Sequence, residues 1–347
     1  MGGLWYSNRE MKGGAAMSRD HVYQALAECA GEYLSGEELS RRLGITRAAV
    51  WKAVESLRQQ GCTIEARTGR GYRLAEVEDT LGRREIAAFL KEERPHWRAE
   101  EQVDSTSSLC KRLAMEGAPD GTAVIADSQS AGRGRMGRDF QSPAGQGVYF
   151  SILWRPEVPP EKLICLPALG AVAACRAVES VCEVRPQIKW PNDLVFHGKK
   201  LGGILTEMAM ESESGAVEYV VLGIGINVHQ KRGDFAGEVA DIASSLDAEL
   251  GQKVSRPRLA AELLREMDRL RREALNTPEA WLEEYRADCL TVGREVQVIR
   301  AGHPLPATAL AIADDYGLTV RYRDGTMETV RSGEVSVRGL YGYVPEA

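Results

Sequence analysis

Several features that would assign a 347-residue sequence to a class at once are missing here. Its seven cysteines are dispersed, with no C-x-x-C pair and no metal-like cluster, which argues against a zinc ribbon or a disulfide scaffold and indicates reduced thiols. The first stretch lacks the apolar core of a signal peptide. No apolar run approaches the roughly 18–20 residues that span a bilayer, so we expect a cytoplasmic protein without membrane contact. A net charge of −6 excludes a uniformly basic nucleic-acid binder but allows a local basic patch.

The composition that is present is that of a globular protein, with 44% hydrophobic and 27% charged residues. The length suits two or three domains of roughly 100–200 residues each. Residues 1–17 are glycine-rich and aperiodic and contain Met11 and Met17, so they are either a disordered tail or a misassigned start. We predict domains over 18–76, 80–289 and 290–347.

The first predicted domain has the pattern of a winged helix-turn-helix. A helical pattern begins at Arg19, and helices are predicted over Gly36–Leu43 and Arg47–Gln60, joined by a three-residue turn that contains glycine. Helix, short turn and helix is the spacing of the helix-turn-helix motif. Two short strands, Thr63–Arg67 and Gly71–Leu74, then predict a hairpin that would form the wing.

The second helix and the wing are basic in a chain that is acidic overall. Six Arg or Lys residues and two Glu residues lie between Thr46 and Leu74, a net +4. This charge suits phosphate contacts beside a major groove, although small winged helices also serve as protein-interaction modules. The candidate DNA-binding residues are Thr46, Arg47, Lys52, Arg58, Arg67 and Arg70.

A glycine- and arginine-rich stretch, Ala126–Arg138, follows a predicted strand at Thr122–Ala126 and reads A-D-S-Q-S-A-G-R-G-R-M-G-R. Glycine lets backbone N–H groups approach a ligand closely, and arginine presents a planar cationic fork that suits phosphate or carboxylate. Taken alone, the stretch predicts either a loop that closes over an anionic ligand or a flexible basic linker.

Three other stretches have the same ambiguity. The residues Asp104–Ser107 lie at a predicted strand-to-helix junction. They form either a plain helix cap or a corner that binds a hydrogen-bond acceptor. Lys189 lies within a predicted strand that Pro191 ends, before a turn at Asn192 and Asp193, so it points either into a cavity or to solvent. The strand Tyr219–Val228 contains glycines that let a ligand approach the sheet, but it is not a G-x-G-x-x-G fingerprint.

After Leu290, short alternating strands predict a small SH3-like barrel.

Five motifs in this order, D-S-T-S, S-Q-S-A-G-R-G-R-M-G-R, K-W-P-N-D, K-L-G-G-I-L-T-E and G-I-G-I-N, resemble those of biotin–protein ligases. With the winged helix in front, the chain is similar to the bifunctional class that also represses biotin-synthesis genes. The resemblance runs from about Ser18 to Val337. It implies an α+β fold with an N-terminal winged helix-turn-helix, a central mixed sheet flanked by helices as in class II synthetases, and a C-terminal SH3-like β-barrel.

The resemblance also implies a reaction. Biotin and ATP, with Mg²⁺, form biotinyl-5′-AMP and pyrophosphate, and a lysine of the biotin carboxyl carrier protein, a subunit of acetyl-CoA carboxylase, then attacks the acyl carbon. The adenylate would act as corepressor, promoting a homodimer that binds operator DNA. Two alternatives are a lipoate or octanoate ligase, which shares the core, and a repressor that binds biotin without transferring it.

The family motifs assign site residues by position. The catalytic residues implied are Lys189, Arg133 and Arg135. The biotin-binding set is Ser105, Thr106, Ser107, Gln129, Arg133, Gly134, Arg135, Lys189, Gly202, Gly203 and Gly225, and the ATP- or adenylate-binding set is Gly132, Arg135, Arg138, Asn192, Asn227 and Arg338. Two positions depart from the pattern: Ser107 stands where the family usually has Asn, and Met136 stands where a third arginine is common.

Overall fold

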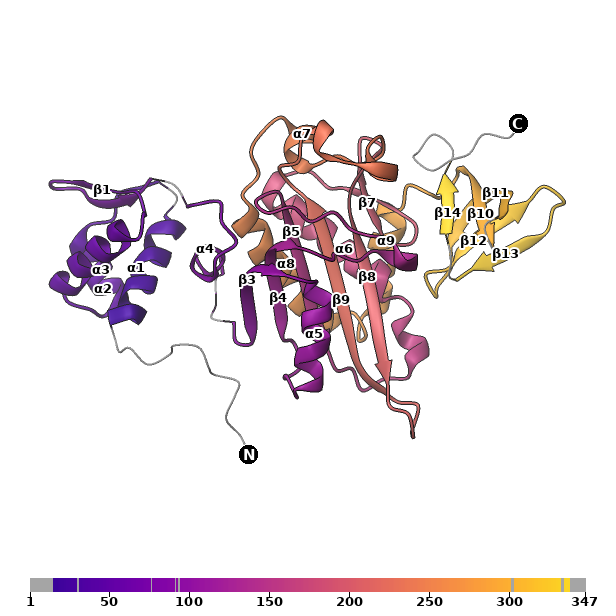
Figure 1. The fold of residues 1–347 in the computed structure, drawn as a ribbon, viewed down its shortest axis with the longest axis horizontal. Coiled ribbons are helices and arrows are strands. Elements are labelled where there is room, and N and C mark those ends of the chain that lie inside the picture. The colour runs from indigo at the N-terminus through magenta and orange to yellow at the C-terminus, as the bar shows by residue number, and fades with distance from the viewer. Residues whose placement is uncertain are drawn as a thin grey trace. The chain divides into compact units, whose positions relative to one another are not determined.

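The chain folds into two compact units, Met1–Arg94 and Pro95–Ala347 (Figure 1). The computed structural model describes residues 15–29, 31–75, 77–90, 92, 94–300, 303–331 and 334–337. Residues 1–14 of the predicted tail and Arg338 lie outside the described residues. The finer division into domains over 18–76, 80–289 and 290–347 stays a prediction.

The N-terminal unit contains the predicted helix-turn-helix. Its elements are α1 (Ala15–Glu28), α2 (Gly36–Leu43), α3 (Arg47–Gln59), β1 (Ile64–Arg67), β2 (Gly71–Leu74) and α4 (Arg83–Ala87). The helices α1, α2 and α3 enclose a core that includes Leu26, Leu39, Val54 and Leu57, all fully buried. The strands β1 and β2 pair antiparallel from Ile64 opposite Leu74, which gives the predicted hairpin.

Local sequence signals explain where these helices begin and end. The Thr46 hydroxyl accepts a hydrogen bond from the Ala49 N–H at 3.2 Å and so caps the start of α3, as expected of an N-cap residue. Gly44 ends α2 with a left-handed φ of 64°. The helix α4 ends early, because the amides of Phe89 and Leu90 bond carbonyls only three residues back and the α-helical pattern stops.

The second unit is built on a seven-stranded mixed sheet. Its strands are β3 (Trp97–Val103), β4 (Ala123–Gln129), β5 (Gly147–Trp154), β6 (Gln187–Lys189), β7 (Asp193–Phe196), β8 (Lys199–Met210) and β9 (Val217–Asn227), in the spatial order β3-β4-β5-β9-β8-β7-β6. In the part of the chain that the structure describes, β3 and β4 are the one parallel pair of this sheet, and its other neighbouring strands pair antiparallel. The strand β4 extends three residues further than predicted, which places Gln129 in the sheet opposite Val103.

Helices cover both faces of this sheet (Figure 1). On one face lies α5 (Thr106–Met115), whose Ser107 contacts Ser151 of β5. On the other lie α6 (Leu166–Cys182), α8 (Arg256–Glu273) and α9 (Pro278–Asp288). The two faces are distinguished by neighbouring residues of β9, because Leu222 faces Gly170 of α6 whereas Gly223 faces Ser107.

The helix α6 corrects one expectation. The segment Pro160–Cys182, a short 3₁₀ turn (Pro160–Leu163) followed by α6, is long and apolar enough to cross a membrane by length and composition alone. Within the fold it serves as a core helix, and its residues from Ala171 to Cys175 are fully buried. Its apolar character is therefore explained by packing against the sheet, α8 and α9.

A second, smaller sheet forms the C-terminal part of this unit. It comprises β10 (Glu295–Arg300), β11 (His303–Ile312), β12 (Leu318–Tyr322), β13 (Met327–Val330) and β14 (Glu334–Val337), antiparallel and in the order β13-β12-β11-β10-β14. The Trp190 indole N–H donates to the Tyr316 carbonyl at 3.0 Å and thereby joins this sheet to the main one. The predicted run of short strands is confirmed, and closure into an SH3-like barrel stays a prediction.

Candidate active site

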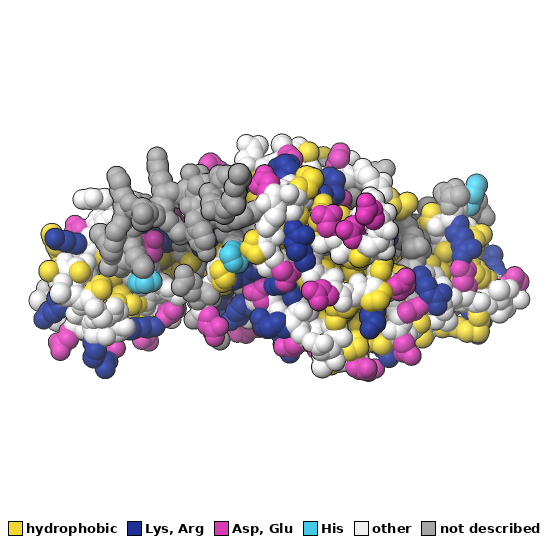
Figure 2. Space-filling view, turned by 90° about the horizontal axis from the view of Figure 1, so that it is seen from below, with side chains coloured by type: hydrophobic (Ala, Val, Ile, Leu, Met, Phe, Trp, Pro, Cys, Tyr) yellow, Lys and Arg dark blue, Asp and Glu magenta, His cyan; other side chains and the backbone are white. Residues whose placement is uncertain are grey.

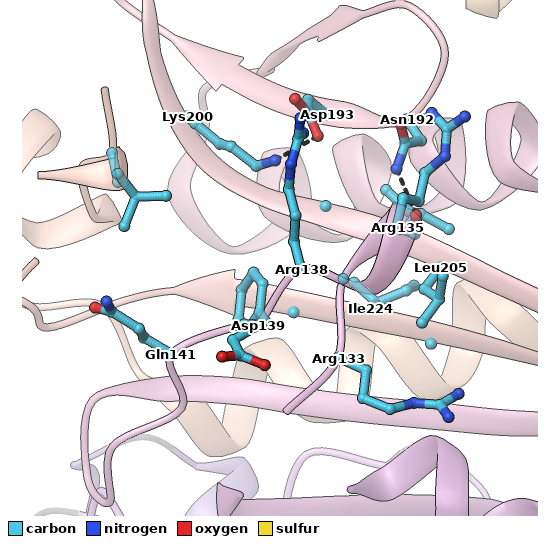
Figure 3. A pocket seen from close by; sticks show the side chains of 18 of the residues that line it. Arg133, Arg135, Arg138, Asp139, Gln141, Asn192, Asp193, Lys200, Leu205 and Ile224 are labelled. Carbon is cyan, nitrogen blue, oxygen red and sulfur yellow. Dashed lines mark hydrogen bonds and ion pairs between the residues drawn. The ribbon is translucent and has the colours of Figure 1, made fainter. Parts of the chain in front are cut away.

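A cavity of about 680 Å³ lies on the α5 side of the large sheet. Its floor is formed by β8 and β9, and its walls come from the start of α5, the arginine–glycine loop after β4, the turn between β6 and β7, and the loop after β9. All four stretches singled out in the sequence therefore meet at one cavity. The loop is not a linker, since Arg133, Arg135 and Arg138 all line this cavity (Figure 3).

One end of the cavity is a corner of buried hydroxyl groups. Thr106 Oγ1 lies 2.8 Å from Ser151 Oγ, and Ser107 Oγ lies 3.0 Å from the same atom. Gln129 Oε1 accepts from the Thr106 N–H at 2.9 Å, and its Nε2 donates to Ser142 Oγ at 2.8 Å. The side chains of Ser105 and its two neighbours do not make a plain helix cap, because Ser105 accepts no capping hydrogen bond.

Ser151 was missed from the sequence, and it is fully buried at the centre of this corner. We expect Ser151→Ala to leave the Thr106 and Ser107 hydroxyls short of a partner, which costs about 1–3 kcal/mol of unfolding free energy. The family resemblance predicts that this corner binds biotin, so the KM for biotin should rise more than the KM for ATP. Denaturant unfolding and initial rates with each substrate varied measure both effects. Ser128→Ala is the matched control, since Ser128 lies on β4 beside Gln129, donates its hydroxyl to the Glu101 carbonyl and does not line the cavity.

The loop itself is tied to the sheet by its cations. Arg133 forms an ion pair with Glu207 of β8, and Arg135 donates to Asn192 Oδ1 at 2.9 Å. Figure 3 shows Arg138 extending toward Asp193 and Lys200, which pair with each other at 2.6 Å. Between the first two arginines, Gly134 donates its N–H to the Arg138 carbonyl at 2.7 Å and turns the loop back on itself.

Lys189 lies on the wall that the end of β6 and the turn after it contribute to the cavity. It is 6% exposed, ends β6, and stands between the buried residues Ile188 and Trp190. The segment that follows is held by α9: the Tyr285 hydroxyl donates to the Pro191 carbonyl at 3.0 Å, and burial raises the pKa of Tyr285 well above its usual value, so it remains a donor. The backbone beside Lys189 is thus held in place, and its buried side chain lines the cavity, where a lysine can meet an anion.

The base of the loop is closed by a pair that the sequence analysis missed. Arg256, 3% exposed at the start of α8, donates to Asp127 Oδ1 at 2.6 Å and approaches the Gly147 carbonyl at 3.4 Å. The other Asp127 oxygen accepts from the Gly145 N–H at 3.0 Å. Residues just before and just after the loop are therefore held together, which fixes its two ends over the cavity.

The loop after β9 forms an apolar wall, with Phe235, Val239 and Ile242 lining the cavity. It is linked to the arginine–glycine loop by Gln141, whose amide donates to the Ala236 carbonyl at 3.0 Å and accepts from the Ala236 N–H at 3.3 Å. Asn227, at the end of β9, holds the Ser244 carbonyl at 3.1 Å with its side-chain amide.

Most of the predicted small-molecule site residues line the cavity. Gly132 and Gly202 do not, and Arg338 lies outside the described residues. A Cβ at Gly202 would overlap the Gly225 carbonyl, so glycine there permits close pairing of β8 with β9. Gly225 does line the cavity, where a Cβ would meet the Phe140 ring at 2.5 Å.

The predicted DNA-binding residues lie on α3 and the hairpin of the N-terminal unit. Arg47, Lys52, Arg67 and Arg70 are exposed. Arg58 instead donates from Nη2 to the Ile64 carbonyl at 2.7 Å and from Nη1 to Glu55 at 2.7 Å, contacts that favour a structural role. The guanidinium carbons of Arg67, Arg70 and Arg73 lie 5.0–5.9 Å from the centre of the Tyr33 ring, which gathers the cations of the hairpin.

Figure 2 shows a different surface on the larger unit, where acidic and basic side chains are interspersed. On the described part of that face, side chains of one charge do not form a large patch, in agreement with the modest net charge of the whole chain.

Comparisons with known proteins agree with both units. Residues 99–227 match the biotin/lipoate A/B protein ligase family and residues 19–73 match a helix-turn-helix domain. The chain is 36% identical to the bifunctional ligase/repressor BirA of Bacillus spizizenii, over 88% of this chain and 95% of that protein. The chain belongs to the family of BirA bifunctional ligase/repressors.

Other members of the BirA family and their structures extend the match. The BirA of Escherichia coli is 31% identical over 89% of this chain and 94% of its own length. A biotin protein ligase from Aquifex aeolicus, solved with biotin and ATP, has a TM-score of 0.59 and 28% identity, covering 71% of this chain and 99% of that one. The resemblance in the five ordered motifs is therefore confirmed.

The two departures from the BirA family pattern can now be located. Ser107 keeps its hydroxyl within the hydrogen-bonded corner, so the missing amide leaves no gap in that network. Met136 is 71% exposed and has a left-handed φ of 57° within the loop. Its replacement of an arginine removes one cation from the loop, while Arg138 still reaches into the cavity.

Proposed function

We propose that the chain is an ATP-dependent biotin–protein ligase that makes biotinyl-5′-AMP and transfers biotin to a lysine of the biotin carboxyl carrier protein. The observation that carries this is the convergence of a buried lysine and three loop arginines on one cavity that ends in a hydroxyl corner. In both reaction steps negative charge develops beside the biotin carboxyl group and the α-phosphate, and preorganised cations stabilise such charge.

In the first step, a biotin carboxylate oxygen attacks the α-phosphorus of ATP and pyrophosphate leaves. Lys189 would hold the carboxylate and phosphoryl oxygens from the sheet, while Arg133 and Arg135 would approach them from the loop. In the second step, the carrier lysine nitrogen attacks the acyl carbon and AMP leaves with the bonding electron pair. The same three cations would then stabilise the departing phosphate.

The two ends of the cavity suit the two ends of the adenylate. The hydroxyls of Ser105–Ser107 and the amide of Gln129 would bind the polar ring of biotin, with Gly203 and Gly225 as backbone walls. Asn192, Asn227 and Arg138 would bind the AMP part, and the apolar side chain of Phe235 offers a face for the adenine ring.

Other parts of the proposal concern the surroundings of the site. Among described residues, no group of three or more acidic, His or Cys side chains is arranged to hold a metal, so Mg²⁺ would arrive on the ATP phosphates as part of the substrate. We also propose that the C-terminal sheet is an SH3-like barrel that brings Arg338 toward the adenylate, and that the protein acts in the cytoplasm beside its carrier.

The ligase proposal is tested by incubating the protein with a carrier domain, ATP and either biotin or lipoate. We expect the intact mass of the carrier to increase by one biotinyl group, with pyrophosphate released only when biotin is present. Modification with lipoate alone would favour the lipoate or octanoate ligase that shares this core. Biotin binding without pyrophosphate release would instead identify a non-catalytic biotin sensor.

We further propose that the chain represses biotin-synthesis genes when the adenylate promotes a homodimer and two helix-turn-helix units bind one operator. We expect DNA from upstream of these genes to bind more tightly with biotin and ATP than with either alone, measured by fluorescence anisotropy. Sedimentation in the same mixtures should show the dimer. Equal affinity in all mixtures would contradict the corepressor role but not the ligase.

A further inference from the structure

The exposed face of α3 carries a large aromatic side chain that the core does not explain. Trp51 is 55% exposed, whereas Val50, Ala53, Val54 and Leu57 of the same helix are buried. The exposed positions 47, 48, 51 and 52 share one side of the helix, as expected for residues separated by three or four positions. An indole has a large apolar body and one polar N–H group, and for this reason tryptophan is enriched at surfaces that meet a partner.

The charges around this indole define the chemistry of the partner. Arg47 lies one helical turn before Trp51, and Lys52 is its neighbour; both are exposed. The hairpin of the same unit adds the exposed Arg67 and Arg70. An apolar group beside the cations of Arg47 and Lys52 suits duplex DNA, whose phosphates meet the cations while its bases offer apolar contact at the C5 methyl group of thymine.

We propose that Trp51 reads sequence by packing its indole against a thymine methyl group in the major groove. The inference rests on the proposed function, since it requires this unit to bind operator DNA. Trp51 stands four residues after Arg47, a rise of about 6 Å along the helix. Base pairs follow one another about every 3.4 Å, so the thymine should lie about two base pairs from the base contacted by Arg47.

The test uses the full chain with biotin and ATP. Duplexes that bind are first selected from a randomised pool, and each thymine of the selected site is then replaced by uracil, which removes only the methyl group. For the wild-type protein we expect uracil at one position in the site to weaken binding about fourfold. This is the change in affinity that corresponds to the loss of one buried methyl group. For Trp51→Ala, duplexes with thymine or uracil there should bind equally.

Arg70→Ala is the control for a cation without base readout: it should weaken binding to every duplex and leave the thymine preference unchanged. Thermal unfolding checks that Trp51→Ala folds, and Trp51→Gln, which is polar but similar in length, serves in its place if it does not. A thymine preference that persists in these Trp51 variants, or no uracil effect in the wild type, would overturn the inference. If the wild type selects no site at all, the operator proposal fails together with it.

Discussion

Lys189→Met should abolish most adenylate formation while leaving the protein folded. Biotin-dependent pyrophosphate release is expected to fall by roughly 30- to 1,000-fold, the loss of about 2–4 kcal/mol that follows removal of one preorganised electrostatic contact. Methionine preserves the length and volume of the side chain between Ile188 and Trp190, so packing at the end of β6 changes little. Rapid quench with labelled ATP measures the adenylation step directly.

The stability of this variant separates a catalytic loss from a structural one. Replacing Lys189, which is 6% exposed, by an apolar residue removes both its desolvation cost and its polar contacts, so the unfolding free energy should change much less than the activation free energy of adenylation. Lys199→Met is the matched control, because Lys199 begins β8, donates to the Asp241 carbonyl at 2.6 Å and does not line the cavity. Undiminished pyrophosphate release from Lys189→Met would remove this lysine from the mechanism.

Much of this site could be predicted from the sequence because its parts carry local signals. A serine–threonine run after a strand, a lysine within a strand and glycines between arginines each indicated an unusual position. Local pattern left two possibilities for each stretch, however. The structure resolves them through contacts between distant elements, as where Arg135 meets Asn192, a residue 57 positions away.

The residues that were missed share one property: their roles arise only from the pairing of strands and helices. Ser151 is one polar residue in a strand of buried residues, and only the approach of α5 makes it the centre of the hydroxyl corner. Asp127 and Arg256 are 129 residues apart, so no periodicity connects them. Arg58 is the opposite case, a residue to which the sequence assigned a function that its contacts do not favour. Its charge predicted a DNA contact, but its guanidinium group donates to the Ile64 carbonyl, which the turn into β1 brings close.

Arg135→Gly should leave the fold intact but let the adenylate escape before transfer. Arg135 bridges the loop to Asn192, whose own amide holds the Ile204 carbonyl at 2.5 Å, so this cation fixes the loop against the turn after β6. Loss of a hydrogen bond to a charged group costs about 1.5–3 kcal/mol, equivalent to release about ten- to a hundredfold faster. Chasing bound, labelled biotinyl-5′-AMP with unlabelled adenylate measures this rate.

Two further variants distinguish loss of the cation from added flexibility of the loop. Met136→Gly introduces glycine at the next position, where the backbone already has a left-handed φ, yet retains Arg135. It should hold the adenylate nearly as well as the wild type. Arg135→Lys keeps the charge but loses the planar fork, so its release rate should be intermediate. If Met136→Gly released the adenylate as fast as Arg135→Gly, backbone stiffness rather than the Arg135 cation would retain the intermediate.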